Sequence, residues 1–362
     1  MIADHLMNGK DRRLPSSVDT DLASPLQDYY RSYLYNGINN QFDRLNNIMK
    51  LSIIIVNWNT KGLLDRCLGS IYLNPPLVPF EIIVVDNASI DGSPEMIKRR
   101  FPSVKLICSE SNLGFAKGNN AGIAHARGKY CLLLNPDTVV LPNAFDKMIE
   151  YIDRNPKVGI VGASLLDENH NPCASYGYFP RVLSTAIEFS GLYHHSPFLK
   201  KLMRPLGMVV TDTKPLEVEY VSGAALLIRT SIIKELGGLS EDYFAYFEET
   251  DLCFQVRQKS WKIIVLPNAK IIHFGGASFQ GINDKRWELL HKGLFTYLRR
   301  NRGSFSVLAL KSLLLLLYSL KKAGLSLIGI LKPSIKDIKD RKKNYDTLIH
   351  LVIHEALPDR KI

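Results

Sequence analysis

The sequence predicts an α/β fold built on a mostly parallel sheet with helices on both faces. Three observations support this prediction. From residue 51 onward, short apolar runs that suit strands alternate with stretches that suit helices, an order typical of a parallel sheet. The apolar runs are continuous, as expected for strands buried on both faces. Polar residues directly follow several of the runs, at the sheet edge where open α/β folds bind ligands.

The elements of this fold can be placed along the chain in order. Strands are expected at 51–56, 81–85, 104–108, 130–134 and 158–163, and helices at 61–73, 93–100, 118–126 and 142–154. The alternation then fades, and residues 164–215 are expected to be irregular. Later strands are expected at 218–220, 224–228, 262–265 and 270–273, and later helices at 231–236 and 249–260.

Composition and charge divide the chain into three segments. Residues 1–48 are polar and lack a sustained period, which predicts a disordered or dispensable extension with a short helix near 26–34. Residues 49–280 are expected to form one domain. The tail, 281–362, carries 17 Lys/Arg and 7 Asp/Glu, so it holds +10 of the net charge of +11. A basic tail indicates nucleic acid or an anionic membrane surface as partner.

Within the tail, two apolar runs of nine residues, 312–320 and 323–331, are separated by Lys321 and Lys322. A spanning helix needs about 20 apolar residues in succession, so a helix lying in the membrane interface is favoured. A pair of core-packing helices and a true span remain alternatives. Leucines rather than stacking aromatics separate the charges, so we expect no nucleic-acid partner. Five scattered cysteines without a CxxC pair, and no export signal, predict a reducing, cytoplasmic location.

Polar residues follow four predicted strands and should meet at one sheet edge. They are Asn57; Asp86, Asn87, Ser89 and Asp91; Asn112, Gly114, Gly118 and Asn119; and Asp137. Any one group could be only a turn, but four in register predict a ligand site. Asp86 can accept hydrogen bonds from a base, and Gly118 is expected to open a helix whose N-terminus favours phosphate. Pro136 should end its strand near Asn135, leaving Asp137 free to bind Mg²⁺ or Mn²⁺ with substrate phosphates.

A fifth cluster, Glu248, Glu249 and Asp251, places three carboxylates within four positions. Like charges raise the pKa of at least one, which suits a general base, although a helix N-terminus also welcomes acidic residues. His273 ends a predicted strand. It could be a core or loop histidine, or a second metal ligand beside Asp137.

Together these clusters resemble the family 2 inverting glycosyltransferases with the GT-A fold, in particular the bacterial rhamnosyltransferase-like branch. The similar runs are IIIVNWNT, IIVVDNASIDGS, NLGFAKGNN, LLLNPDTVV, VSGAALLIR, GGLSEDYFAYFEETDLC and IIHFGG. The family's DxD metal motif corresponds to Asn135-Pro136-Asp137, with Asn in place of the first Asp. Its acidic base motif corresponds to Glu248-Glu249-Thr250-Asp251, where Glu249 stands at a position usually held by Asp.

The resemblance implies roles for these residues. Asp137 and His273 would hold Mg²⁺ or Mn²⁺, Gly223 would line the sugar and acceptor site, and Glu249 or Glu248 would be the base. The polar residues at the first three strand ends, Asn57, Asp86, Asn87, Ser89, Asp91, Asn112, Gly114, Gly118 and Asn119, would bind the nucleotide of the donor or shape its loop. The QxxRW signature of processive synthases is absent, which implies addition of a single sugar.

The function implied by the resemblance is inverting transfer of one sugar, with rhamnose as a candidate, in cell-surface polysaccharide synthesis. The donor would be dTDP- or UDP-linked, and the acceptor a glycan or a lipid-linked glycan, at the inner face of the membrane. Two rivals fit poorly, because neither the G-x-G-x-x-G of a dinucleotide-dependent oxidoreductase nor the Gly-rich basic loop of a nucleotidyltransferase follows the first strand. A non-catalytic nucleotide-sugar-binding module of the same fold remains an alternative.

Overall fold

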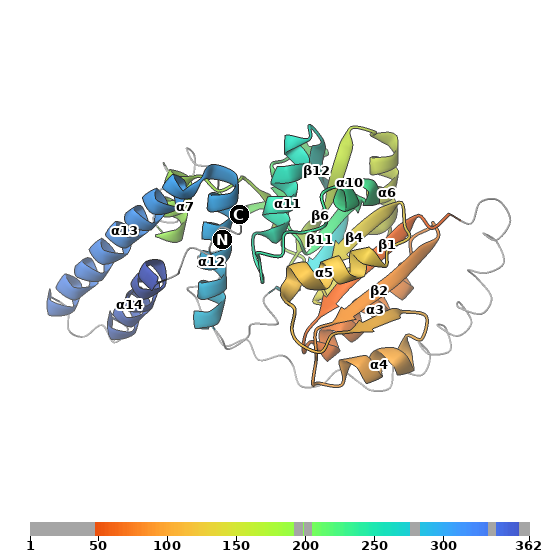
Figure 1. Ribbon diagram of the computed structural model, residues 1–362, viewed down its shortest axis with the longest axis horizontal. Helices are drawn as coiled ribbons and strands as arrows, with labels where there is room; N and C mark the ends of the chain where they lie inside the picture. The colour runs from red at the N-terminus through yellow and green to blue at the C-terminus, as the bar shows by residue number, and fades with distance from the viewer. Residues whose placement is uncertain (1–47, 192–197, 199–204, 276–282, 332–337, 355–362) are drawn as a thin grey trace.

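A mixed sheet of nine strands, mostly parallel in its first half, forms the centre of the protein (Figure 1). The computed structural model describes residues 48–191, 198, 205–275, 283–331 and 338–354. Nearly all of the predicted N-terminal extension, and with it the helix expected near 26–34, lies outside the described residues. The five cysteines all lie within them and are unpaired.

The strands follow one another across the sheet in an order that is not their order in the chain. From one edge they are β3 (Lys105–Cys108), β2 (Phe80–Asp86), β1 (Leu51–Asn57), β4 (Tyr130–Leu134), β11 (Ala225–Arg229), β6 (Val158–Leu166), β12 (Lys262–His273) and β5 (Thr138–Val140), with β9 (Leu216–Glu217) also on β12. β1, β2, β3 and β4 pair in parallel, as do β6 and β12. β11 runs antiparallel to β4 and β6, and β5 and β9 run antiparallel to β12.

Helices cover both faces of this sheet, as predicted. Alternate residues of a strand point to opposite faces, so Ile53 and Ile55 pack into a core with α3 (Lys61–Leu73), α4 (Ser93–Arg100) and α6 (Ala144–Arg154). Ile54 packs on the other face, into a core shared with α5 (Gly114–Ala124), α10 (Thr230–Glu235) and α11 (Glu248–Gln258).

The second core continues into the C-terminal helices α12 (Asn283–Arg302), α13 (Ser304–Leu331) and α14 (Ile338–His354), which lie to one side of the sheet beside α7 (Val182–Phe189) (Figure 1). Val307, Leu310, Leu314 and Tyr318, spaced three or four residues apart, are completely buried along one face of α13. The core-packing alternative is therefore correct for this face of the tail, which is continuous with the core of the sheet.

Two predictions about secondary structure after residue 163 were wrong. Residues 164–215, expected to be irregular, contain β7 (Ala174–Gly177), α7 and β8 (Met208–Val209), and β10 (Tyr220–Val221) completes a small antiparallel sheet. Strands of two to four residues are too short to show a period in the sequence. The strands expected at 262–265 and 270–273 are one strand, β12, with a register shift between Leu266 and Lys270 where Pro267 cannot donate.

Candidate active site

A cavity of about 1130 Å³, counting its open mouth, lies at the carboxyl ends of β1 and β4. Its wall comes from segments that are far apart in the chain. The loops after β1, β2 and β3 supply one side, and the 244–249 segment with residues 222–224 supplies another. Asp137, His273 and Arg286 complete the lining. The strand ends predicted to meet at one sheet edge therefore do so.

The residues predicted as metal ligands lie side by side, although 136 positions separate them in the chain. β5, which directly follows Asp137, pairs antiparallel with the end of β12, so that Thr138 lies opposite His273. The N–H of Phe274 donates to the carbonyl oxygen of Asp137 over 3.0 Å. This pairing brings His273 Nε2 to 3.3 Å from Asp137 Oδ1.

The donor atoms at this point fit a divalent cation that is shared with a substrate. Asn135 Nδ2 lies 3.3 Å from His273 Nε2, while Asn135 Oδ1 is buried and makes no hydrogen bond to the described residues. A carboxylate, an imidazole and a spare amide oxygen suit Mn²⁺ or Mg²⁺. No cluster of three or more His, Cys, Asp or Glu with metal-binding geometry occurs in the described part of the chain. Oxygens of a substrate or of water would complete the shell of a cation held here.

The side of the cavity predicted to bind the nucleotide, called the nucleotide side below, is supported by a closed hydrogen-bond network. Asn57 and Asp86 are opposite each other on β1 and β2, and Asn57 Nδ2 donates to Asp86 Oδ2 over 2.8 Å and to Ser89 Oγ over 3.1 Å. The N–H of Ser89 donates to Asp86 Oδ1, and Thr60 Oγ1 donates to Asn57 Oδ1. Asn57 and Asp86 are almost completely buried and outside the cavity lining, so they hold the two loops together.

Asp91 also stabilises these loops, through hydrogen bonds to backbone N–H groups. Its Oδ2 accepts from the N–H of Lys61 over 2.8 Å, and its Oδ1 accepts from the N–H of Ser93, at the start of α4. Asn87, in contrast, lines the cavity, where its Nδ2 donates to the carbonyl oxygen of Gly114 over 3.0 Å. The predicted group after β2 thus divides into one residue that faces the cavity and three that shape the loop behind it.

The expectation that Gly118 opens a helix was wrong, because α5 begins at Gly114. The side chain of Asn112 accepts from the N–H of Gly114 over 2.9 Å and turns the chain into the helix early. Gly118 therefore lies within the helix, where a Cβ would come within 2.8 Å of the Val56 side chain, and its small size lets α5 approach β1 closely. Asn119 is buried, and its Nδ2 donates to the carbonyl oxygen of Phe115.

Asn112 and Gly114 do line the cavity, and Gly114 connects it to the carboxylate side. Its φ is +78°, and a Cβ there would lie 2.5 Å from the carbonyl oxygen of Phe244. Glycine is needed on both counts. The N–H of Phe115 donates to the same carbonyl oxygen over 2.7 Å, so the start of α5 holds the loop that precedes Glu248.

That loop is strained where it enters α11. Tyr246 and Phe247 both have φ of +72°, a conformation that costs bulky residues about 1–3 kcal/mol each. α12 passes close behind, since a Cβ on Gly293 would lie 2.4 Å from the carbonyl oxygen of Tyr246. The surrounding structure thus fixes an unfavourable backbone that places two carboxylates at the first positions of α11.

Glu248 and Glu249 both line the cavity, and burial raises the pKa of each. The neighbouring charge of Glu249 raises the pKa of Glu248 further, and Glu248 Oε2 has no hydrogen-bond partner among the described residues. Backbone N–H groups at the helix start and the Thr250 hydroxyl partly offset burial at Glu249. Ionising both of two adjacent buried carboxylates is unfavourable, so the pair favours a state with a single negative charge.

Gly223 and Asp251 both lie near the Glu248–Glu249 pair, but only Gly223 lines the cavity. Gly223 packs directly against Glu249, since a Cβ there would lie 3.3 Å from Glu249 Cβ. Asp251 points away from the cavity, and its Oδ1 accepts from Asn301 Nδ2 of α12 over 2.6 Å. Asp251 therefore anchors α11 to α12.

Several lining residues were given no role in the prediction, among them Trp58, Tyr246 and Arg286. Trp58 lies inside a run that the resemblance had identified, so its position after β1 was a usable signal. Arg286 belongs to the segment predicted as a membrane-associating tail, and nothing local connects it to a cavity. It hydrogen-bonds Tyr246 and so lowers in part a tyrosine pKa that burial has raised.

Solved structures with a similar fold are glycosyltransferases. The mannosyltransferase PcManGT from Pyrobaculum calidifontis, in complex with GDP-Man and Mn²⁺, matches with a TM-score of 0.51 at 16% identity, over 92% of this chain and 94% of that one. GalNAc-T7 with UDP, GalNAc and Mn²⁺ matches with a TM-score of 0.52 at 16% identity, over 94% of this chain and 67% of that one. The protein thus has the GT-A fold that was predicted.

The sequence family agrees. The profile of glycosyl transferase family 2 matches residues 52–236, just over half of the chain, so the protein belongs to that family. An N-acetylglucosaminyl-diphospho-decaprenol L-rhamnosyltransferase of Mycobacterium tuberculosis is 25% identical over 244 residues, 62% of this chain and 75% of its own. The rhamnosyltransferase WbbL of Escherichia coli K12 is 24% identical over 261 residues, 69% and 93%. The resemblance to the rhamnosyltransferase-like branch is confirmed, and the protein is a glycosyltransferase.

Proposed function

We propose that the protein is a metal-dependent, inverting glycosyltransferase that moves one hexosyl residue from a nucleotide-sugar to a glycan or lipid-linked acceptor. The observation that carries this proposal is a single cavity that contains both the Asp137–His273 pair and the Glu248–Glu249 pair. One pair suits a diphosphate leaving group and the other suits an attacking hydroxyl. The names of the rhamnosyltransferase relatives support rhamnose as the sugar, and that of the Mycobacterium tuberculosis relative supports a lipid-diphosphate-linked acceptor. We propose a dTDP- or UDP-linked donor and a role in cell-surface polysaccharide synthesis.

On the donor side, Asn87, Asn112 and Trp58 face the cavity and are the candidates to contact the nucleotide. The buried residues Asn57, Asp86, Gly118 and Asn119, with the half-buried Ser89 and Asp91, keep that side rigid. Asp137 and His273 would hold Mg²⁺ or Mn²⁺ against the diphosphate, where a divalent cation neutralises charge that develops on the leaving nucleotide.

On the acceptor side, Glu249 is the base. Its carboxylate accepts the proton of an acceptor hydroxyl as that oxygen bonds to the anomeric carbon. The bond from the same carbon to the diphosphate breaks, and the nucleoside diphosphate leaves with its electron pair. Attack opposite to the leaving group inverts the configuration. Glu248 stays protonated beside Glu249, which keeps the charge of the pair at one.

We also propose that the protein acts at the cytoplasmic face of a membrane, bound through α13. The face of α13 opposite its buried stripe is apolar yet exposed: Leu308, Leu316 and Leu320 are 55–63% exposed, and Phe305 is 81% exposed. Length and composition alone would let Ser304–Ile328 cross a membrane. Burial of the inner face against the core instead favours a helix that lies on the surface, among basic residues of the tail.

Vesicle co-sedimentation tests the membrane part. Leu308→Ser combined with Leu316→Ser should weaken binding to vesicles of anionic phospholipid at least about tenfold, since each leucine loses about 1.5–3 kcal/mol of burial. Leu77→Ser, which changes an exposed leucine in the loop before β2, is the control. Equal vesicle binding by both variants would remove α13 as the contact. A 49–362 chain should keep its activity if the N-terminal extension is dispensable.

Thermal denaturation with a panel of dTDP- and UDP-sugars, each with and without Mn²⁺ or Mg²⁺, tests the donor. We expect stabilisation that requires both nucleotide and metal, and stabilisation by dTDP-sugars above UDP-sugars supports a rhamnosyl donor. Donors that bind are then assayed for transfer to an N-acetylglucosaminyl-diphospho-alkyl acceptor and for hydrolysis. Binding without either reaction would identify a non-catalytic module instead.

A further inference from the structure

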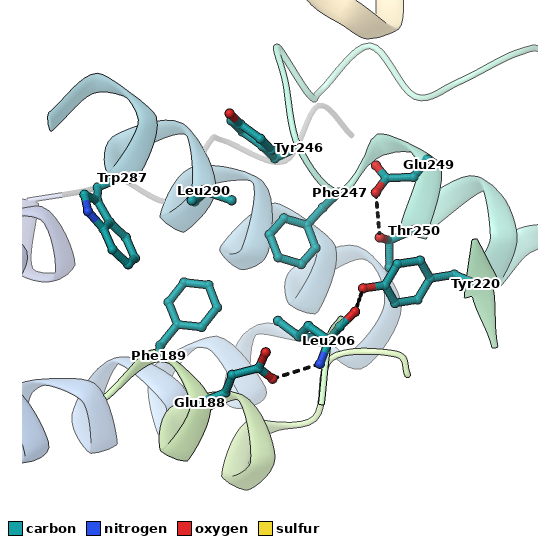
Figure 2. A pocket seen from close by; sticks show the side chains of 10 residues that line it. All are labelled: Glu188, Phe189, Leu206, Tyr220, Tyr246, Phe247, Glu249, Thr250, Trp287 and Leu290. Atoms are coloured by element: carbon teal, nitrogen blue, oxygen red, sulfur yellow. Dashed lines mark hydrogen bonds between the residues drawn. The ribbon is translucent and has the colours of Figure 1, made fainter. Parts of the chain in front are cut away.

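Glu249 also lines a second cavity (Figure 2), and neither Asp137 nor His273 is part of its lining. It encloses about 590 Å³, counting its mouth, and shares only Tyr246 and Glu249 with the first cavity. Its other walls come from α7 and α12, which approach the entry of α11 from the opposite side. Glu249 therefore stands at the boundary between two cavities, and Asp137 and His273 line only one of them.

The lining of this second cavity combines flat apolar surfaces with a carboxyl group. Phe189, Phe247 and Trp287 surround the space, and the rings of Phe189 and Trp287 meet edge to face with centroids 6.4 Å apart. Glu188, only 6% exposed, turns its carboxyl group to the same space, where Oε2 accepts from the N–H of Leu206 over 2.8 Å. Neither Glu188 nor any of these rings has a role in the donor site.

This combination suits a sugar ring. The C–H face of a pyranose packs on aromatic side chains, and its hydroxyls donate to carboxyl oxygens. A hydrocarbon chain would fill the apolar part but would leave the buried Glu188 carboxyl group without a new partner, which is unfavourable. Burial raises the pKa of Glu188 to about 7, so a hydroxyl donor in the cavity would meet an acceptor that water solvates poorly.

The position of the cavity indicates which sugar. In an inverting displacement the base contacts the acceptor, on the side of the reacting carbon away from the leaving group. Given the proposed function, on which this inference rests, the space next to Glu249 but apart from Asp137 is where the acceptor must approach. We propose that the second cavity is the subsite for the acceptor sugar, a pyranose held between the aromatic rings with one hydroxyl bonded to Glu188 and another presented to Glu249.

Tryptophan fluorescence offers a direct test, because each of the two cavities is lined by a different one of the chain's three tryptophans. Trp58 lines the donor cavity, Trp287 lines the second cavity, and Trp261 lines neither. In the full-length Trp261→Phe protein, adding Trp58→Phe leaves only Trp287 to fluoresce, and adding Trp287→Phe leaves only Trp58. Methyl glycosides of glucose, N-acetylglucosamine, galactose and rhamnose are the probes, with dTDP and UDP plus Mn²⁺ as donor-site probes.

We expect at least one methyl glycoside to change the emission of Trp287 saturably and to leave that of Trp58 unchanged, and a nucleotide to do the reverse. Emission changes of Trp287 with a short-chain prenyl phosphate but with no glycoside would overturn the assignment. The fluorescence measurement requires no sugar transfer, so its result does not depend on whether the proposed function is correct. A wild-type protein that transfers sugar while no glycoside perturbs Trp287 would keep the function and lose the subsite.

Kinetic measurements with the N-acetylglucosaminyl-diphospho-alkyl acceptor provide a second test of the acceptor subsite. Glu188→Gln keeps the size and the contact with Leu206 but replaces one acceptor oxygen by a donor, and it should raise the KM for acceptor about tenfold with a smaller change in kcat. The control is Glu150→Gln, an exposed glutamate in α6. An unchanged KM for acceptor in Glu188→Gln would overturn the hydroxyl contact, and a purely structural role would move the unfolding temperature without separating KM from kcat.

Discussion

The two sides of the active-site cavity differ in how completely their polar side chains are hydrogen-bonded within the protein. On the nucleotide side, the side chains of Asn57 and Asp86 find partners within the protein, in a network with Thr60 and Ser89. On the carboxylate side, Glu248 Oε2 is buried without a hydrogen bond among the described residues, and the backbone before it is strained. One side is complete before any ligand arrives, and the other is not.

This difference predicts which residues matter more for stability and which matter more for activity. A satisfied network fixes loop positions and stabilises the fold, so its residues should matter first for stability. Buried carboxylates with raised pKa values destabilise the fold at neutral pH but supply a base that is poorly solvated. Changes on the carboxylate side should therefore reduce activity more than stability, and changes on the nucleotide side should do the reverse.

The largest expected effect comes from Glu249→Gln. Loss of the base should lower the rate of transfer about 10³-fold, while metal-dependent nucleotide binding persists because the proposed nucleotide contacts and metal ligands are unchanged. The measurement is single-turnover transfer beside nucleotide titration. Glu248→Gln is the matched control and should retain most of the rate, since a neutral amide replaces a carboxyl group that is already protonated. A larger loss in Glu248→Gln than in Glu249→Gln would reverse the assignment of the base.

A second prediction concerns pH and stability through Glu188. Its pKa rises from 4.5 in the unfolded chain to about 7 in the folded protein, chiefly because of burial. An acid with a raised folded-state pKa does not destabilise below pH 4.5, and the free energy of unfolding falls as pH rises from there to about 7. The 2.5-unit difference corresponds to about 3 kcal/mol.

Denaturant unfolding of the wild type and of Glu188→Gln at pH 5 and pH 7.5 checks this. The variant has no proton to lose, so the gap between the two proteins should change by most of that amount in favour of the variant at the higher pH. A gap that is independent of pH would show that Glu188 titrates normally.

Much of the parallel half of the fold was predictable from sequence, because continuous apolar runs mark buried strands. Pro136 ends its strand as expected, since β4 stops at Leu134. The meeting of Asn57 with Asp86 follows from the rule that parallel strands place their carboxyl ends together. From the residues alone, the partnership of Asp137 with His273 was only one alternative, and the resemblance favoured it. Antiparallel pairing of a three-residue strand with the end of β12 leaves no local signal.

The rest depended on contacts between distant segments. The start of α5 moved four residues upstream of the prediction because Gly114 and Phe115 dock on Phe244, about 130 residues later. The aromatic wall of the second cavity joins α7, in a region expected to be irregular, to α12, in a segment expected to be tail. Each of these helices looks ordinary alone, so only the folded arrangement reveals that they enclose a space beside Glu249.

The third prediction is a loss of metal-linked binding in Asp137→Asn. The amide keeps the shape but removes the only carboxylate beside His273 in the cavity, so the increase in nucleotide affinity caused by Mn²⁺ should largely disappear and transfer should fall about 10²-fold. Calorimetric titration of UDP or dTDP with and without Mn²⁺ measures the first effect. The unfolding temperature without ligand should stay close to that of the wild type. Full retention of the Mn²⁺ effect would place the cation elsewhere.

The smallest expected effect tests the comparison most directly. Thr60→Val is nearly isosteric and removes the 2.6 Å hydrogen bond to Asn57 Oδ1, leaving a buried acceptor without its partner and lowering the free energy of unfolding by about 1–2 kcal/mol. Thr347→Val, at a half-buried position of α14 where the hydroxyl makes a solvent-exposed hydrogen bond to the carbonyl oxygen of Lys343, is the control. Glu248→Gln should lower the free energy of unfolding little or not at all, because Glu248 Oε2 has no hydrogen bond to the described residues to lose. Equal losses of unfolding free energy in Thr60→Val and Glu248→Gln would contradict the proposed difference between the two sides of the cavity.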